Sequence, residues 1–147
     1  MKKLLITGLV ALTATFANAD LEWSWWLDKP NATTDVSLGL ASQCKTVNTL
    51  EASVFYSASP VQDALQFTLF GLNNSDASCP LQMAFFNRGK DPCVQLGFAN
   101  ANKSSTFGMG FLNFSDDAKF QLGFLNFNKK GFLPVFIFVN FNPEIFD

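Results

Sequence analysis

One short phrase recurs along the second half of the chain at a fixed spacing of 13 residues. It reads LQMAFFN at 81–87, VQLGFAN at 94–100, FGMGFLN at 107–113 and FQLGFLN at 120–126. Each phrase ends in asparagine, and its fourth residue is Gly97, Gly110 or Gly123, with Ala84 in the first phrase. A tandem array of this kind decides the fold before any single residue does.

The same spacing extends beyond the four phrases. Backward it reaches Gly71 and Asn74, and forward it reaches Phe136, with Asn140 one residue late. The sequence therefore predicts six repeat units between about residues 65 and 141.

Within a unit, bulky apolar residues alternate with small ones. Phe120, Leu122 and Phe124 share one face of the phrase 120–126, and the other face holds Gln121, Gly123 and Leu125. A period of two indicates a strand and does not fit a helix. One face of each strand is thus apolar and free of charge, and the other is small with an occasional amide.

Eight or nine strands are expected over the whole chain. They lie at 21–27, 34–41, 49–58, 63–72, 79–87, 92–100, 106–114, 119–127 and 132–141. About eight residues of strand and five of turn fill a unit, which favours an all-β antiparallel up-and-down meander with hairpin loops. Closing the meander into a small barrel would remove its edges. If each hairpin pairs about its turn centre, Gln82 would lie opposite Gly97 on the next strand, which would fill a narrow lumen, and the Phe-rich face would lie outside in lipid.

The alternative fold is a β-solenoid in which each 13-residue unit is one coil. Asparagine in a fixed column would then form an internal amide ladder. The apolar run of each unit, however, is seven or eight residues long and reads as straight, which leaves only about five residues for the rest of a coil. The barrel is therefore the first expectation and the solenoid the second.

The N-terminus has the pattern of a bacterial secretion signal. Lys2 and Lys3 precede an apolar run from Leu4 to Phe16, and Ala17-Asn18-Ala19 suits a signal peptidase. The apolar run is shorter than the roughly 20 residues of a spanning helix. We expect residues 1–19 to be a signal peptide and residues 20–147 to be a single all-β repeat domain.

Composition argues against several functions. The chain has no His, which removes the commonest general base and metal ligand, and its formal net charge of −2 gives no attraction for nucleic acid. Asp116 and Asp117 fit a solvated hairpin loop better than a catalytic pair. We expect no enzyme activity, no cofactor and no catalytic or metal site. The repeat asparagines are expected to cap turns, with sugar or ice-like water on an exposed face as the alternative.

Two smaller features leave alternatives open. The cysteines Cys44, Cys79 and Cys93 have no zinc-type spacing, so one disulfide and one thiol, or three buried thiols, are expected. In a barrel only Cys44 and Cys79 would lie at the same end, whereas in a solenoid Cys79 and Cys93 would nearly stack. The tryptophan-rich stretch 21–27 fits either an interfacial anchor or a plug at the end of a core.

At the repeats, the chain resembles the leptospiral-type surface-repeat proteins, which are exported bacterial proteins built from tandem phrases with Gly, Gln, Gly and Asn at fixed positions. The resemblance rests on 82–87, 94–100, 108–113 and 121–126, and on the closing phrase 131–141 with its Leu-Pro-aromatic pattern. The chain departs from the pattern at Ala84 and Phe136 in the Gly column and at Gly108 and Pro134 in the Gln column. The resemblance implies an exported surface or envelope protein and carries no biochemical activity.

Two functions follow from these observations. The first is a structural or interaction protein of the bacterial envelope or surface, folded as a small outer-membrane barrel in contact with lipid or envelope components. The alternative is a soluble periplasmic or secreted module that binds an apolar or glycan ligand. Neither the ligand nor the binding residues follow from the sequence.

Overall fold

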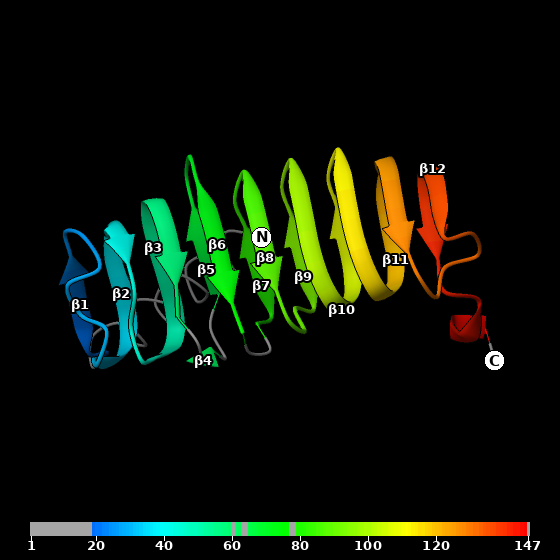
Figure 1. Cartoon of the computed structure of the whole chain (residues 1–147). Coiled ribbons are helices and arrows are strands. Elements are labelled where there is room, and N and C mark those ends of the chain that lie inside the picture. Colours follow the sequence, from blue (N-terminus) through cyan, green and yellow to red (C-terminus); the bar gives the residue numbers. More distant parts are fainter. Residues whose placement is uncertain (1–18, 60, 63–64, 77–78, 147) are drawn as a thin grey trace, which may run out of the picture.

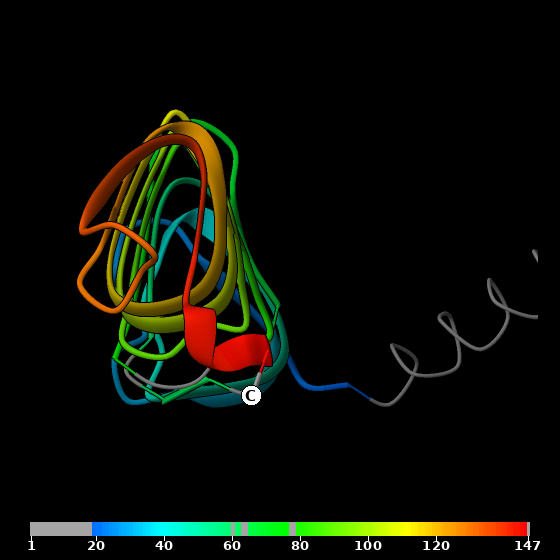
Figure 2. The ribbon, with the colours of Figure 1, turned by 90° about the vertical axis from the view of Figure 1, so that its right-hand side faces the viewer.

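The protein is a β-solenoid. The computed structural model describes residues 19–59, 61–62, 65–76 and 79–146, so the expected signal peptide lies outside the described residues apart from Ala19. Successive coils stand side by side from β1 to β12 (Figure 1), and they nearly superimpose when seen along the solenoid axis (Figure 2). The all-β prediction is confirmed.

In the described part of the chain, twelve strands form one continuous sheet that wraps around the coils. They are β1 (Leu21–Ser24), β2 (Thr33–Ser42), β3 (Thr46–Ala58), β4 (Val61–Gln62), β5 (Leu65–Thr68), β6 (Leu72–Ser75), β7 (Leu81–Met83), β8 (Phe86–Gly89), β9 (Val94–Leu96), β10 (Ala99–Met109), β11 (Leu112–Asn128) and β12 (Val135–Phe141). A short 3-10 helix, Pro143–Phe146, follows.

The strand pairing is parallel from β1 to β11, and only β12 runs antiparallel to its neighbour. The expected antiparallel meander closed as a barrel is therefore wrong, and the alternative of a solenoid with 13-residue coils is the observed fold. Ala99 pairs with Leu112 and Phe107 with Phe120, so each residue lies beside its own repeat partner. Gln82 accordingly pairs with Gln95, not with Gly97.

The repeat phrases are not straight strands, because each one bends at the glycine column. The phrase 94–100 is two strands: β9 ends at Leu96, the chain bends at Gly97 and Phe98, and β10 begins at Ala99. A Cβ atom on Gly97 would lie 2.2 Å from the carbonyl oxygen of Ala84, and one on Gly110 would lie 2.3 Å from that of Gly97. Glycine is required because the backbones of neighbouring coils touch at this corner.

The outer repeat units differ from the sequence prediction. Asn73, and not Asn74, stands in the asparagine column, because it pairs with Asn87. Phe67 pairs with Met83 before the corner, and Leu72 pairs with Phe86 after it. Four residues separate the first and third of these and two separate the second and fourth, so the earlier corner is two residues longer. Ala84, which stands in the glycine column, lies on the next coil against this wider corner.

The expected sixth unit is a terminal strand. β12 reverses direction, and Asn140 pairs with Gln121 while Phe136 pairs with Asn126. The backbone NH of Phe132 donates to the carbonyl of Phe141 at 2.7 Å, so the preceding loop covers part of the outer edge of β12. A covered edge limits strand addition at this end.

The interior is mostly polar. Among the described residues, the buried hydrophobic ones are small or medium in size, such as Val36, Val47 and Ala118, whereas the largest fully buried side chains are mainly Gln and Asn. Apolar packing inside is confined to a small cluster of Cys44 and Val47 with Ala32. Hydrogen bonds inside the coil therefore replace the usual apolar core.

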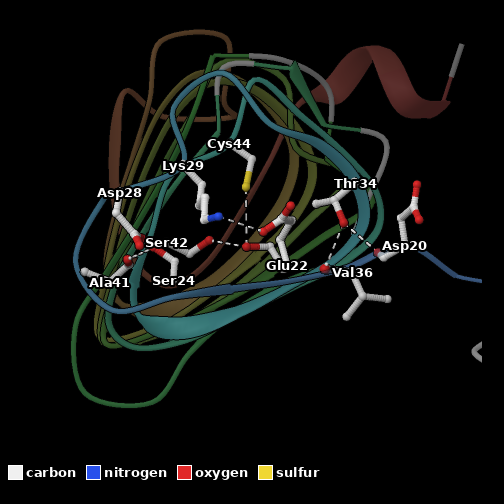
Figure 3. Close-up of polar contacts among 11 residues, drawn as sticks. Asp20, Glu22, Ser24, Asp28, Lys29, Thr34, Val36, Ala41, Ser42 and Cys44 are labelled. Carbon is white, nitrogen blue, oxygen red and sulfur yellow. Dashed lines mark hydrogen bonds and ion pairs between the residues drawn. The ribbon is translucent and has the colours of Figure 1, made fainter.

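Hydroxyl and charged groups fill the first coils (Figure 3). The Ser24 hydroxyl bonds to the Asp28 carboxylate at 2.6 Å and to the carbonyl of Ala41 at 2.9 Å. The Ser24 bond lowers the pKa of Asp28. Lys29 and Glu22 form an ion pair of 3.4 Å across this end of the solenoid. Charged groups thus close the N-terminal end of the described chain.

Candidate functional surface

The repeat asparagines form an internal ladder. Each Nδ2 donates to the Oδ1 of the next coil: Asn73 to Asn87 at 3.0 Å, Asn87 to Asn100 at 2.9 Å, and Asn100 to Asn113 and Asn113 to Asn126 at 2.8 Å. These side chains are at most 2% exposed. The alternative of an exposed binding face is therefore wrong, whereas bonds such as that from Asn126 to the carbonyl of Gly123 at 3.0 Å do hold the turn, as the capping prediction expects.

The same amides also bond to the backbone at the corner. Asn87 donates to the carbonyl of Leu96 at 2.8 Å, and Asn100 donates to that of Met109 at 2.8 Å. A buried polar group without a partner costs about 1 to 3 kcal/mol, so the column stabilises both itself and the bend. The asparagines are structural residues.

A second column, of glutamines, donates in the opposite direction along the axis. Gln95 donates to Gln82 at 2.7 Å, Gln82 to Gln66 at 2.8 Å, and Gln66 to the Glu51 carboxylate at 3.0 Å. The buried Glu51 also accepts a bond from Ser59 at 2.8 Å. These glutamines are committed to the interior and are not available to an external ligand.

Gly108 interrupts the glutamine column. Asn102 compensates on one side by donating to the Oε1 of Gln95 at 2.6 Å. On the other side, the Nε2 of Gln121 has no glutamine of the preceding coil to bond to and donates instead to the carbonyl of Phe127 at 3.2 Å. The column ends at β12, where the buried Oε1 of Gln121 and Oδ1 of Asn140 have no partner among the described residues.

The outer surface carries a row of stacked phenylalanines at the corner of the coils. Phe85, Phe98, Phe111 and Phe124 have ring centroids 5.0, 5.2 and 4.9 Å apart and planes within 10° of parallel. Phe138 of β12 ends the row with an edge contact to Phe124 at 6.5 Å. We call these five residues the aromatic ridge. They are 42% to 63% exposed.

An apolar hollow runs beside the ridge. Its walls include Met83, Leu96, Phe85 and Phe98, and its floor is at Gly97. On the far side of the hollow, the row of Met83 and Met109 is also exposed, at 38% and 48%. The prediction that the bulky faces point outward is thus confirmed, although they lie on a solenoid and not on a barrel.

Charged residues lie on the opposite side of the coil. Lys103 follows Phe98 by five residues and precedes Phe111 by eight, roughly half a turn from either. On this side Lys129 pairs with Asp116 at 2.6 Å, and Lys130 pairs with Asp117 at 2.9 Å. The solenoid is therefore amphipathic, with an aromatic side and a charged side.

Asp116 and Asp117 do not act as a pair. Each bonds to a different lysine, and Asp117 also accepts a bond from Asn142 at 3.0 Å. The hydrogen bond from Lys130 lowers the pKa of Asp117, and Asp117 in turn raises the pKa of Lys130. The residues lie in β11 and not in the expected hairpin loop.

The expected disulfide is not present, because none of Cys44, Cys79 and Cys93 is bonded to another cysteine. The NH of Cys93 donates to the carbonyl of Cys79 at 2.9 Å, so the two residues do lie on adjacent coils. The two cysteines are 14 residues apart, one more than the length of a coil. Because successive side chains of a strand point to opposite faces, Cys79 is buried and Cys93 is exposed. Burial raises the pKa of Cys44 and raises that of Cys79 to about 11.

The tryptophans do not plug a core. β1 ends at Ser24, and the backbone turns near Leu27, whose φ is 52°. Trp23, Trp25 and Trp26 are 53% to 65% exposed, and Trp23 and Trp25 make an edge contact at 6.2 Å. They add an aromatic patch to the N-terminal end.

Comparison with known proteins finds no matching family model, curated protein or solved structure. Within the described residues, no group of three or more His, Cys, Asp or Glu could hold a metal ion. The described part of the chain also has no helix long and apolar enough to cross a bilayer. The aromatic ridge is the candidate functional surface. The sequence placed its phenylalanines outside but did not single them out, although their column at 13-residue spacing was visible.

Proposed function

We propose that this chain is an exported bacterial envelope or surface protein with a structural or interaction role, and that it acts through the aromatic ridge. The observation that carries the proposal is a regular, half-exposed row of stacked phenylalanines beside a hollow whose lining includes no charged residue. Exposed apolar patches of this extent mark interaction sites on soluble proteins. The secretion-type N-terminus and the resemblance to exported surface-repeat proteins support the location.

The polar residues of the repeats argue for a scaffold role. Their amides are buried and bonded along the axis, so they hold the coils in register. The outer side chains are then displayed at a constant spacing. A rigid scaffold with one apolar edge suits contact with a large surface better than capture of a small molecule.

Cell fractionation of the full chain in a bacterial host tests the proposal. We expect mass spectrometry to find a mature N-terminus at Asp20 and most of the protein in the envelope fraction. The double variant Phe98→Ser/Phe111→Ser should still be exported but should move to the soluble fraction. Phe114→Ser is the matched control, because Phe114 is 41% exposed and stacked on Phe127 but lies off the ridge. An uncleaved cytosolic protein would refute the proposal.

A second candidate is a soluble module that binds a glycan or an apolar ligand. A hollow of about 380 Å³ lies beside the Phe114–Phe127 stack, with the Asp116–Lys129 pair on its wall. An aromatic face with polar groups at its rim is a chemistry that binds sugar rings. Here the expected results are release of the protein by osmotic shock, signals on a glycan array, and loss of those signals in Phe114→Ser but not in Phe111→Ser.

A further inference from the structure

We infer that the aromatic ridge binds a second copy of this chain, side by side and parallel, around a two-fold axis that runs along the solenoid. This inference rests on the proposed interaction role and names its partner. The ridge and the hollow beside it are the two complementary parts. In such a dimer each ridge lies in the hollow of the other copy.

The geometry of the ridge and the hollow selects this arrangement. The hollow crosses the coils from Phe67 to Phe98, and the first two ridge rings, Phe85 and Phe98, form one of its sides. Met83 and Leu96 also line it. A two-fold axis parallel to the solenoid places each ridge over the opposite hollow, whereas an axis across the solenoid would place ridge on ridge. A two-fold contact is self-complementary, since each copy supplies both parts.

The repeat spacing favours a copy of the same chain over another partner. The ridge rings lie 4.9 to 5.2 Å apart, which is close to the spacing of hydrogen-bonded strands. A second solenoid with the same rise meets this row in register at every rung. A partner with a different spacing would match only some of the rungs.

Charge also favours a second copy over a lipid surface. Neither the ridge nor the lining of the hollow includes a lysine or arginine to bind anionic headgroups, and the described residues include more acidic than basic side chains. The charged side, with Lys103, Asp116 and Lys129, lies across the coil from the ridge. In the dimer the two charged sides therefore face away from each other.

The area is sufficient for a stable contact. A fully exposed aromatic side chain offers about 200 Å², so the five ridge residues at about half exposure offer about 500 Å². The exposed side chains along the hollow are Phe67, Leu69 and Met83, and these add about 200 Å² at a similar exposed fraction. The sum is close to the roughly 800 Å² per partner of a standard interface.

The ends of the solenoid are less suited to association. The Glu22–Lys29 ion pair lies across the N-terminal end, and the loop ahead of β12 bonds to the carbonyl of Phe141 at the other. Stacking of copies end to end would bury that ion pair. The side of the solenoid is therefore the surface on which copies meet.

Light scattering after size exclusion tests the inference on the purified mature chain. We expect a dimer at micromolar concentration, and a dissociation constant at least tenfold higher for Phe111→Ser. Phe114→Ser is the control of similar exposure and should remain dimeric. Circular dichroism of both variants confirms that they are folded. A wild-type monomer at 100 μM, or an unchanged dimer in Phe111→Ser, would overturn the inference.

Thiol crosslinking tests the direction of the two copies. In a Cys93→Ser background, which removes the exposed thiol, Phe98→Cys and Phe124→Cys should each crosslink with themselves through a short bis-maleimide. A mixture of Phe85→Cys with Phe124→Cys should give no mixed product, because these rungs lie at opposite ends of the ridge. The reverse pattern indicates antiparallel copies and overturns the inference. Binding of a monomer to phosphatidylcholine vesicles would instead assign the ridge to lipid, while leaving the proposed envelope role standing.

Discussion

The first coils and the later coils fill their interiors with different polar side chains. In residues 81–128, which we call the amide region, Asn and Gln bridge neighbouring coils and paired residues of β10 and β11 are 13 apart. In residues 21–75, the hydroxyl region, Ser and Thr fill most of the interior, and Gln66 and Asn73 at its end connect it to the amide region. Partners there are 13 apart at Thr33–Thr46 but 15 apart at Ala41–Tyr56, with register shifts between them.

The difference teaches what a regular repeat requires. From Asn87 to Asn126 each ladder amide bonds to the one 13 residues away, so these coils share one length. A hydroxyl rotates to suit its neighbours. Ser53, Ser57 and Thr68 bond among themselves at 2.8 to 3.0 Å, although Ser53 and Thr68 are 15 residues apart. The hydroxyl region therefore fills coils of unequal length.

The strongest test of the comparison is a charge in the asparagine ladder. Asn113→Asp replaces a donor to Asn126 and to the carbonyl of Leu122 by a carboxylate that faces those acceptors. We expect a loss of roughly 3 to 5 kcal/mol in the free energy of unfolding, the range for an uncompensated buried charge. The pKa of the new carboxyl should be raised, so stability should recover as pH falls and be lost as pH rises. Urea denaturation at several pH values measures this.

Asn74→Asp is the control for the ladder. Asn74 is only half-buried and stands next to the ladder residue Asn73. We expect little change in unfolding free energy. If Asn74→Asp is as damaging as Asn113→Asp, the ladder does not pass through Asn73.

Alanine substitutions at two glycines of one repeat unit should change the free energy of unfolding in opposite directions. Gly110→Ala places a Cβ 2.3 Å from the carbonyl oxygen of Gly97, and we expect a loss of about 1 to 3 kcal/mol. Gly108→Ala meets nothing closer than 3.5 Å and should stabilise by about 0.4 to 1 kcal/mol, because alanine restricts the unfolded chain. Thermal melts of the two variants give the comparison. The same sign for both would contradict the corner contact.

The hydroxyl region should be more tolerant. Ser53→Ala removes bonds to Ser57 and Thr68, but those two hydroxyls remain bonded to each other at 3.0 Å. We therefore expect a loss of about 0.5 to 1.5 kcal/mol in unfolding free energy. A loss as large as that of Asn113→Asp would mean that the hydroxyl region is no more adaptable than the amide region.

The sequence predicted an all-β fold and the outward bulky faces, but not where the coils bend or how the strands pair. The decisive clue was present: Gln121 and Asn126 are five residues apart and both are buried. On one straight strand an odd spacing places them on opposite faces. A bend at Gly123 is the only way to bring both inside, so a glycine between two recurrent amides indicates a corner. In the hydroxyl region, no such pattern in the sequence marks where a coil begins and ends. Nothing in the sequence marked the ridge as a contact surface.

The smallest expected effect is on the charged side of the amide region, where coils are joined by ion pairs. Asp117 accepts hydrogen bonds from Lys130 at 2.9 Å and from Asn142 at 3.0 Å, and these lower its pKa. A lowered pKa in the folded state means that the stabilising effect is present at neutral pH and is lost as pH falls through that pKa. Both partners are partly exposed, so the change in stability should be slight. An NMR titration of the Asp117 carboxyl should give a midpoint below that of an unstructured peptide, and Lys130→Met should raise it. A midpoint insensitive to Lys130→Met would show that the coils are held together on this side by backbone pairing alone.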